Sequence, residues 1–104
     1  MTTSAHDPDD MDLETRLNGQ TAQIHWLELQ RYFARGVVRQ VAVGMDLITV
    51  GRAIIDNENS TVQAWLDAEV LTVPDEGRAQ RWFDANTKLW ALVVAPWVLV
   101  QESD

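Results

Sequence analysis

The twelve residues LWALVVAPWVLV, numbered 89 to 100, carry no charge and decide which fold the chain can adopt. A transmembrane helix needs about 20 apolar residues, so twelve residues interrupted by Pro96 are too few. Four of the twelve are valines, and apolar residues occupy both alternating faces. This pattern predicts a strand that is buried on both sides in a sheet.

Pro96 conflicts with a central strand, because proline donates no backbone hydrogen bond. Two interpretations stay open. In the simpler one, a core strand is kinked at the proline. In the other, the segment leaves the sheet, and residues 97–101 pair either with the strand near Val37 or with a second copy of the chain. The second copy would make a homodimer, and the predicted interface residues are Trp90, Pro96, Trp97, Val98 and Val100.

Trp90 and Trp97 are seven residues apart, so a regular strand would place them on opposite faces. Both cannot face one core layer without a bulge. One of them is therefore the best candidate for a contact with a partner or ligand, since aromatic residues with a polar N–H are enriched at such sites. The other three tryptophans lie on apolar helical stripes and are predicted to be core residues: Trp26, Trp65 and Trp82.

The periodicities of the whole chain predict an α+β fold of order α-α-β-α-α-β-α-β, with about five helices and a small mixed three-stranded sheet. Helices are predicted near residues 13–18, 22–33, 46–56, 60–69 and 75–86. Strands rich in β-branched residues are predicted at 37–43 and 70–73, in addition to the C-terminal one. The helix between Val73 and Leu89 suits a right-handed βαβ crossover between parallel strands, with the last strand central.

Three local signals predict where helices begin. Asp46 can cap a helix through its side-chain oxygen. Ser60, followed three residues later by Gln63, has the pattern of a capping box. Pro74-Asp75 combines a proline suited to a first turn with an acidic residue, which favours a helix N-terminus.

Length and charge define the domain organisation and exclude several functions. The 104 residues suggest a single compact domain over residues 13–104, preceded by a disordered acidic tail at residues 1–12. The net charge of -8 disfavours nucleic acid and anionic membranes as partners. The chain has no cysteine, which excludes disulfides and thiolate chemistry. The first twelve residues do not form a secretory signal, so we expect a cytoplasmic protein.

Candidate chemical sites are few. The helix pair over residues 46–69 resembles a helix-turn-helix, but its net charge is -4 and its only basic residue is Arg52, so its charge argues against nucleic-acid binding. The two histidines, at positions 6 and 25, do not form a metal-binding pair. We therefore name no catalytic, cofactor-binding or metal-binding residue. A small enzyme or ligand-binding domain stays as an alternative, using helix-end carboxylates and an arginine: Asp56, Glu58, Asp67 and Glu69 with Arg31, Arg35 or Arg39.

Over residues 24–102 the chain resembles a bacterial family known as domain of unknown function 2288. The resemblance rests on residues 45–47, 53–57 and 62–67, and most specifically on the tail VVAPWVLVQ at residues 93–101. It implies a compact bacterial cytoplasmic domain and no activity. The interpretation favoured by the sequence is a non-enzymatic protein-interaction or self-associating module.

Overall fold

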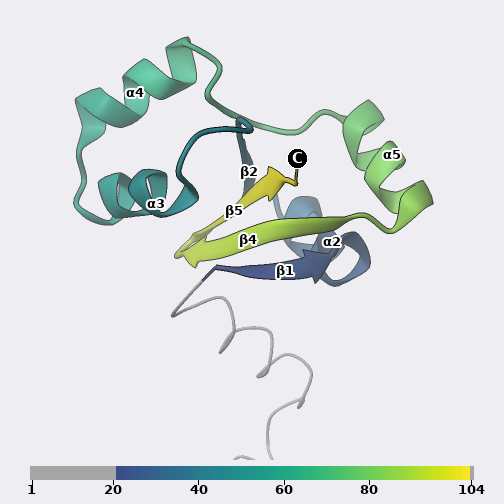
Figure 1. The fold of residues 1–104 in the computed structure, drawn as a ribbon. Helices are drawn as coiled ribbons and strands as arrows, with labels where there is room; N and C mark the ends of the chain where they lie inside the picture. Colours follow the sequence, from purple (N-terminus) through teal and green to yellow (C-terminus); the bar gives the residue numbers. More distant parts are fainter. Residues whose placement is uncertain (1–20, 104) are drawn as a thin grey trace, which may run out of the picture.

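The structure is a computed structural model that describes residues 21–103 (Figure 1). It confirms the α+β class, but the described part has four helices and a five-stranded mixed sheet instead of about five helices and three strands. The predicted helix near residues 13–18 and the predicted disordered tail lie outside the described residues. The elements are β1 (Ala22–His25), α2 (Trp26–Ala34), β2 (Val38–Val41), α3 (Leu47–Ile55), α4 (Asn59–Asp67), β3 (Leu71–Thr72), α5 (Glu76–Ala85), β4 (Lys88–Val94) and β5 (Trp97–Glu102).

The twelve-residue apolar stretch forms two strands instead of one. The chain reverses at Ala95-Pro96, whose peptide bond is cis, and β4 and β5 pair antiparallel from Leu89↔Glu102 to Val94↔Trp97. A kinked single strand is therefore the wrong interpretation. The proline lies in the turn, where no ladder hydrogen bond is required of it, and both halves stay in the sheet.

The sheet has the order β1-β4-β5-β2-β3, so the final strand lies in its middle. β5 pairs with β2 in parallel, with Val38 opposite Val98, which is the pairing with the strand near Val37 that the sequence left open. The predicted crossover is wrong in detail. β3 and β4 run in the same direction, but β5 and β2 lie between them, and the parallel neighbours are β2 and β5.

The segment 22–33, predicted as one helix, begins as strand β1 and becomes helix α2 only at Trp26. Residues 22–25 pair with residues 88–91 of β4. Spacing within the segment cannot reveal a partner that lies 65 or so residues away, and tertiary pairing overrides the local helical pattern here.

Two hydrophobic cores lie on opposite faces of the sheet, because both alternating faces of β4 and β5 are apolar. Helices α2 and α5 cover the first face, and α3 and α4 cover the second (Figure 1). The first core contains Ile24, Trp26, Leu29, Val38, Ala79, Trp82, Leu89, Ala91, Val98 and Val100. The second contains Val41, Leu47, Val50, Leu71, Leu92, Val94 and Leu99.

Two of the three predicted helix starts are confirmed. The side chain of Asp46 accepts a hydrogen bond from the Ile48 amide, and that of Asp75 accepts one from the Arg78 amide. The capping box at Ser60 is wrong, because α4 begins at Asn59 without a side-chain cap, and Gln63 instead donates to Asp67.

Gln101 attaches the loop before α3 to the central strand. Its side-chain Nε2 donates to the carbonyl oxygens of Ala42, at 2.8 Å, and Met45, at 2.6 Å. Both carbonyls lose this donor in a Gln101→Glu variant, which keeps the shape of the side chain but brings a carboxylate against two acceptors. We expect Gln101→Glu to lower the free energy of unfolding by about 2–3 kcal/mol, measured by urea denaturation.

Gln23→Glu is the matched control for this prediction. Gln23 is also a strand glutamine, but it is exposed and donates only to the Ser103 hydroxyl, at 3.2 Å. The control should change the free energy of unfolding by less than about 0.5 kcal/mol. An equal loss in both variants would show that the bonds to Ala42 and Met45 contribute little.

Candidate functional site

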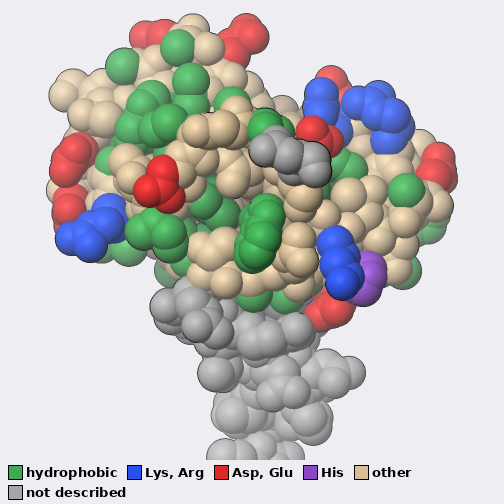
Figure 2. Space-filling view, viewed as in Figure 1, with side chains coloured by type: hydrophobic (Ala, Val, Ile, Leu, Met, Phe, Trp, Pro, Cys, Tyr) green, Lys and Arg blue, Asp and Glu red, His purple; other side chains and the backbone are tan. Residues whose placement is uncertain are grey.

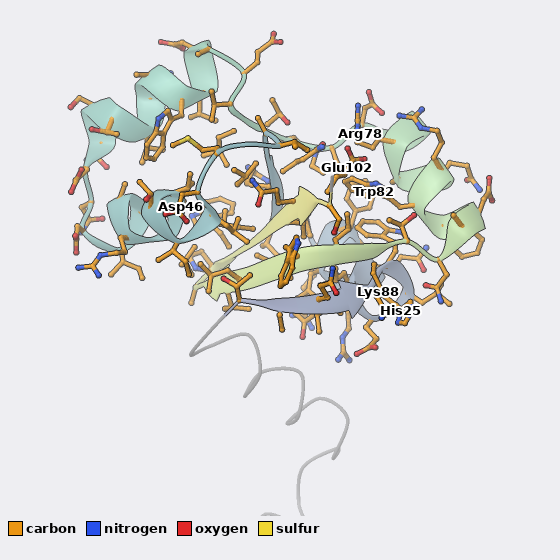
Figure 3. All side chains as sticks on the ribbon, viewed as in Figure 1. His25, Asp46, Arg78, Trp82, Lys88 and Glu102 are labelled. Atoms are coloured by element: carbon orange, nitrogen blue, oxygen red, sulfur yellow. The ribbon has the colours of Figure 1, made fainter. Side chains whose placement is uncertain are left out.

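The face of the sheet under α3 and α4 is only partly covered. Helix α3 lies over Leu92, Val94 and Leu99, and Trp90 lies two residues before Leu92, so it faces the same way. Strand pairing places Gln23 opposite Trp90 and His25 opposite Lys88 on this same uncovered area. We call these four residues, Gln23, His25, Lys88 and Trp90, the Trp90 face. Figure 3 shows His25 and Lys88 close together where β1 and β4 pair.

The Trp90 face combines one large aromatic side chain with polar neighbours. Trp90 is 39% exposed, and Gln23 and Lys88 are also exposed. None of the four residues carries a carboxylate, and Lys88 forms no ion pair with residues 21–103. In Figure 2, hydrophobic side chains gather over α3, α4 and the strands, while most charged side chains lie nearer the outline of the molecule. This mixture of a rigid aromatic and hydrogen-bonding groups is typical of contact surfaces.

The hairpin places Trp97 on the same face as Trp90, against the prediction that the two lie on opposite faces. Because the chain turns back at Pro96, the side chains at positions 97, 99 and 101 face the same way as those at 94, 92 and 90. Trp97 is half-buried, and the guanidinium carbon of Arg39 lies 4.5 Å from its ring centroid. The ring of Trp97 thus already makes a cation–π contact with Arg39, and Trp90 is the more exposed of the two tryptophans.

The remaining predicted interface residues divide into exposed and buried ones. Pro96 is exposed at the hairpin tip. Val98 and Val100 are 3% and 0% exposed and pack in the first core. Both edges of β5 are paired, with β4 and β2, so the last strand offers no free edge to a second copy. Of the five residues, only Trp90 and Pro96 are exposed.

The carboxylates and arginines of the alternative hypothesis are not brought together. Asp56, Glu58, Asp67 and Glu69 are exposed around the ends of α3 and α4, and no charged side chain is buried within residues 21–103. Arg31 and Arg35 lie over the ring of Tyr32, on the opposite side of the sheet. Arg39 lies over the ring of Trp97, and none of the four carboxylates forms an ion pair with an arginine among residues 21–103. The close carboxylate–arginine pairs of this hypothesis are therefore absent from the described part of the chain.

The predicted helix pair is present as α3 and α4, with α3 packed on the sheet. Gly51, Leu47 and Val50 are buried where α3 meets the sheet, while α4 has no buried residue. Within the described range, no group of three or more histidine or acidic side chains is arranged to hold a metal ion. Also over residues 21–103, no helix has the length and apolar character needed to cross a bilayer.

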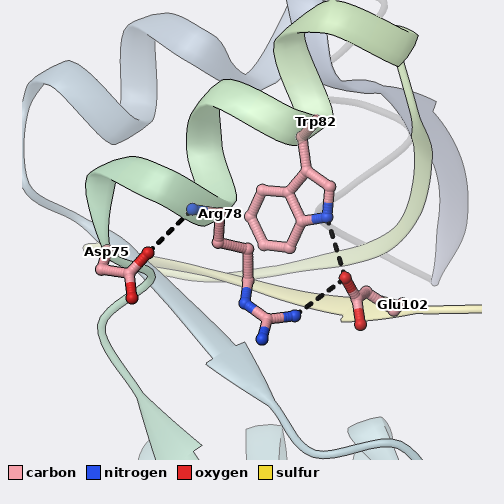
Figure 4. Close-up of polar contacts among 4 residues, drawn as sticks. All are labelled: Asp75, Arg78, Trp82 and Glu102. Atoms are coloured by element: carbon pink, nitrogen blue, oxygen red, sulfur yellow. Dashed lines mark hydrogen bonds and ion pairs between the residues drawn. The ribbon is translucent and has the colours of Figure 1, made fainter.

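The structure also assembles a polar cluster that the sequence did not suggest. A single oxygen of Glu102 accepts hydrogen bonds from Arg78 Nη1 and Trp82 Nε1, both at 3.0 Å (Figure 4). The indole N–H of the nearly buried Trp82 is thereby satisfied, and the guanidinium is fixed beside β5. Arg78 and Glu102 are 24 residues apart on a helix and a strand, so no local spacing predicts their contact.

These features define a small α+β domain with one partly uncovered sheet face. Comparison with known families shows that the chain belongs to the family described as "Protein of unknown function (DUF2288)", whose model matches residues 12–102. The chain is also similar to a solved structure, described as "NMR solution structure of PA1075 from Pseudomonas Aeruginosa". The two share 38% sequence identity and a TM-score of 0.75, over 100% of this chain and 93% of the other. No protein with a curated description matches the chain.

Proposed function

We propose that this protein is a non-enzymatic interaction module of the bacterial cytoplasm that self-associates through the Trp90 face. The observation that carries the proposal is the 39% exposure of Trp90 on a strand inside the sheet, beside area that α3 and α4 leave uncovered. A tryptophan on a rigid strand loses little side-chain freedom on binding and offers a large contact area.

The charge of the Trp90 face is compatible with contact to a second copy of the chain. Two molecules with a net charge of -8 repel each other overall. The Trp90 face has no carboxylate and one lysine, so contact through it keeps the acidic side chains of the two copies apart. The face also contains both donors and acceptors, because Gln23 supplies an amide oxygen and Lys88 an ammonium group. A surface with both can pair with its own copy about a two-fold axis.

The Trp90 face is small compared with a standard interface of about 800 Å² per partner, so we expect a dimer with a dissociation constant of roughly tens of micromolar. Sedimentation equilibrium across this concentration range should give an average mass that rises toward twice the monomer mass. Trp90→Glu should hold the mass at that of the monomer throughout, because two carboxylates would then meet at the centre of the contact.

Phe83→Glu is the matched control, since Phe83 is 45% exposed and lies on α5 at the other side of the sheet. It should associate like the unmodified chain. A chain that stays monomeric at the highest concentration, or a Phe83→Glu variant that loses association as completely as Trp90→Glu, would contradict the proposal.

A further inference from the structure

A polar groove of about 460 Å³ lies at the corner where β2, β3 and α5 meet, away from the Trp90 face. Helix α5 covers the neighbouring part of this side of the sheet but leaves the corner open. The groove is lined by Gln40, Ala42, Glu69, Thr72, Val73, Pro74, Asp75 and Arg78.

The floor of the groove has polar side chains where a core would have apolar ones. Gln40 and Thr72 are cross-strand partners, so they face the same way, and Gln40 shares this face with the buried Val38. Both are half-buried, and neither side chain hydrogen-bonds to another of residues 21–103. An amide and a hydroxyl are therefore held side by side with their hydrogen-bonding capacity unused.

Arg78 supplies an oriented cation at one side of the groove. Its Nη1 is fixed by Glu102 at 3.0 Å, and a guanidinium has five N–H donors in a planar fork. The remaining donors can bind a carboxylate without any rearrangement of the side chain, since the ion pair with Glu102 already restricts its rotamers. Figure 4 shows this side chain extended from α5 toward the strands.

Glu69 and Asp75 give the groove its negative charge. Asp75 uses Oδ1 to cap α5, with a distance of 2.7 Å to the Arg78 amide, while its other oxygen makes no bond within the described chain. Glu69 is exposed and also has no partner there. A ligand with only a negative charge would meet these two carboxylates and Glu102. A ligand that also carries a positive group would pair with Arg78 through its negative group and with Glu69 and Asp75 through its positive group.

We propose that this groove binds a small zwitterion of the free α-amino-acid type. The ligand carboxylate pairs with Arg78 and accepts from Gln40 or Thr72, and its ammonium group lies between Glu69 and Asp75. This site is independent of self-association through the Trp90 face, and neither proposal requires the other. It differs from the earlier alternative of helix-end carboxylates, of which it uses Glu69 alone.

The test is titration of the full chain, labelled with ¹⁵N, with a panel of free amino acids at up to about 10 mM, followed by amide chemical shifts. Acetate and ethylamine, titrated separately, each present one of the two charges. We expect at least one amino acid to shift the amide resonances around Gln40, Thr72 and Arg78 in a saturable way. That amino acid should bind more tightly than acetate or ethylamine alone. No saturable shift with any amino acid, or shifts confined to other parts of the chain, would overturn the proposal.

Two variants locate the contacts. Glu69→Gln removes a charge at an exposed position, and Thr72→Val removes the hydroxyl with little change of shape; each should weaken binding about fivefold to tenfold. Glu58→Gln is the control, because Glu58 is an exposed carboxylate outside the groove and should bind like the unmodified chain. Unchanged affinity in both Glu69→Gln and Thr72→Val would also overturn the proposal.

Discussion

Replacing Trp26 with alanine is expected to lower the free energy of unfolding by about 3–5 kcal/mol. Trp26 is 1% exposed at the start of α2, and its ring centroid lies 5.5 Å from that of Phe33 and 5.0 Å from that of Trp82. The truncation would open a cavity that three elements share: α2, α5 and the sheet. Domains of this size are stable by about 5–15 kcal/mol, so a large part of the total would be lost.

Urea denaturation followed by far-ultraviolet circular dichroism measures this change without dependence on the tryptophan signal. Leu27→Ala is the matched control, because Leu27 is the next residue of α2 and is 52% exposed. It should change the free energy of unfolding by less than about 0.5 kcal/mol. Equal losses in the two variants would show that Trp26 does not fill the core as described.

Gly51→Val is expected to lower the free energy of unfolding by about 3 kcal/mol through overpacking. A Cβ at Gly51 would lie 2.8 Å from Leu92 Cδ2 and 3.2 Å from Val94 Cγ1, and two further methyl groups would enter the same contact. Gly51 therefore allows α3 to lie directly on the hairpin strands. The urea concentration at the midpoint of unfolding should fall, while the slope of the free energy of unfolding against urea concentration stays unchanged.

Gly77→Val tests whether the effect comes from crowding or from the helix itself. Gly77 is exposed in α5, and an added Cβ would meet only Asp75 Oδ1, at 3.5 Å. Valine is a slightly better helix former than glycine, so this variant should be neutral or slightly stabilising. A loss at Gly77 as large as that at Gly51 would assign the cost to valine in a helix and not to the contact with the sheet.

Local signals predicted the elements that have local causes. The β-branched run at 37–43 forms β2, the segment at 70–73 contains β3, and Asp46 and Asp75 cap helices as their side chains allow. The extended backbone of residues 89–100 was also predictable from their composition. The helix caps are made within three residues of the signal. The strands are marked by their β-branched and apolar composition, although their partners lie far away in the sequence.

Apart from the capping box at Ser60, the errors come from interactions between distant residues. Strand β1 has only four residues and is stabilised by β4, which no pattern in residues 22–25 reveals. Pro96 signals an interruption, but its position in a turn follows only once Val94 is seen to pair with Trp97. The same limit applies to the sites. That Trp90 is exposed and Trp97 half-buried depends on where α3 and Arg39 lie, and the groove depends on α5 meeting the β2–β3 corner.

The central position of the last hairpin has a consequence for how the chain folds during synthesis. β1 pairs only with β4, and β2 pairs with β5 and the two-residue β3. Until residues 88–94 have left the ribosome, the short β2–β3 ladder is the only part of the sheet within residues 21–103 that can form. Strand β1 and one edge of β2 therefore wait for their partners, and the sheet can be completed only after the C-terminal hairpin has been synthesised.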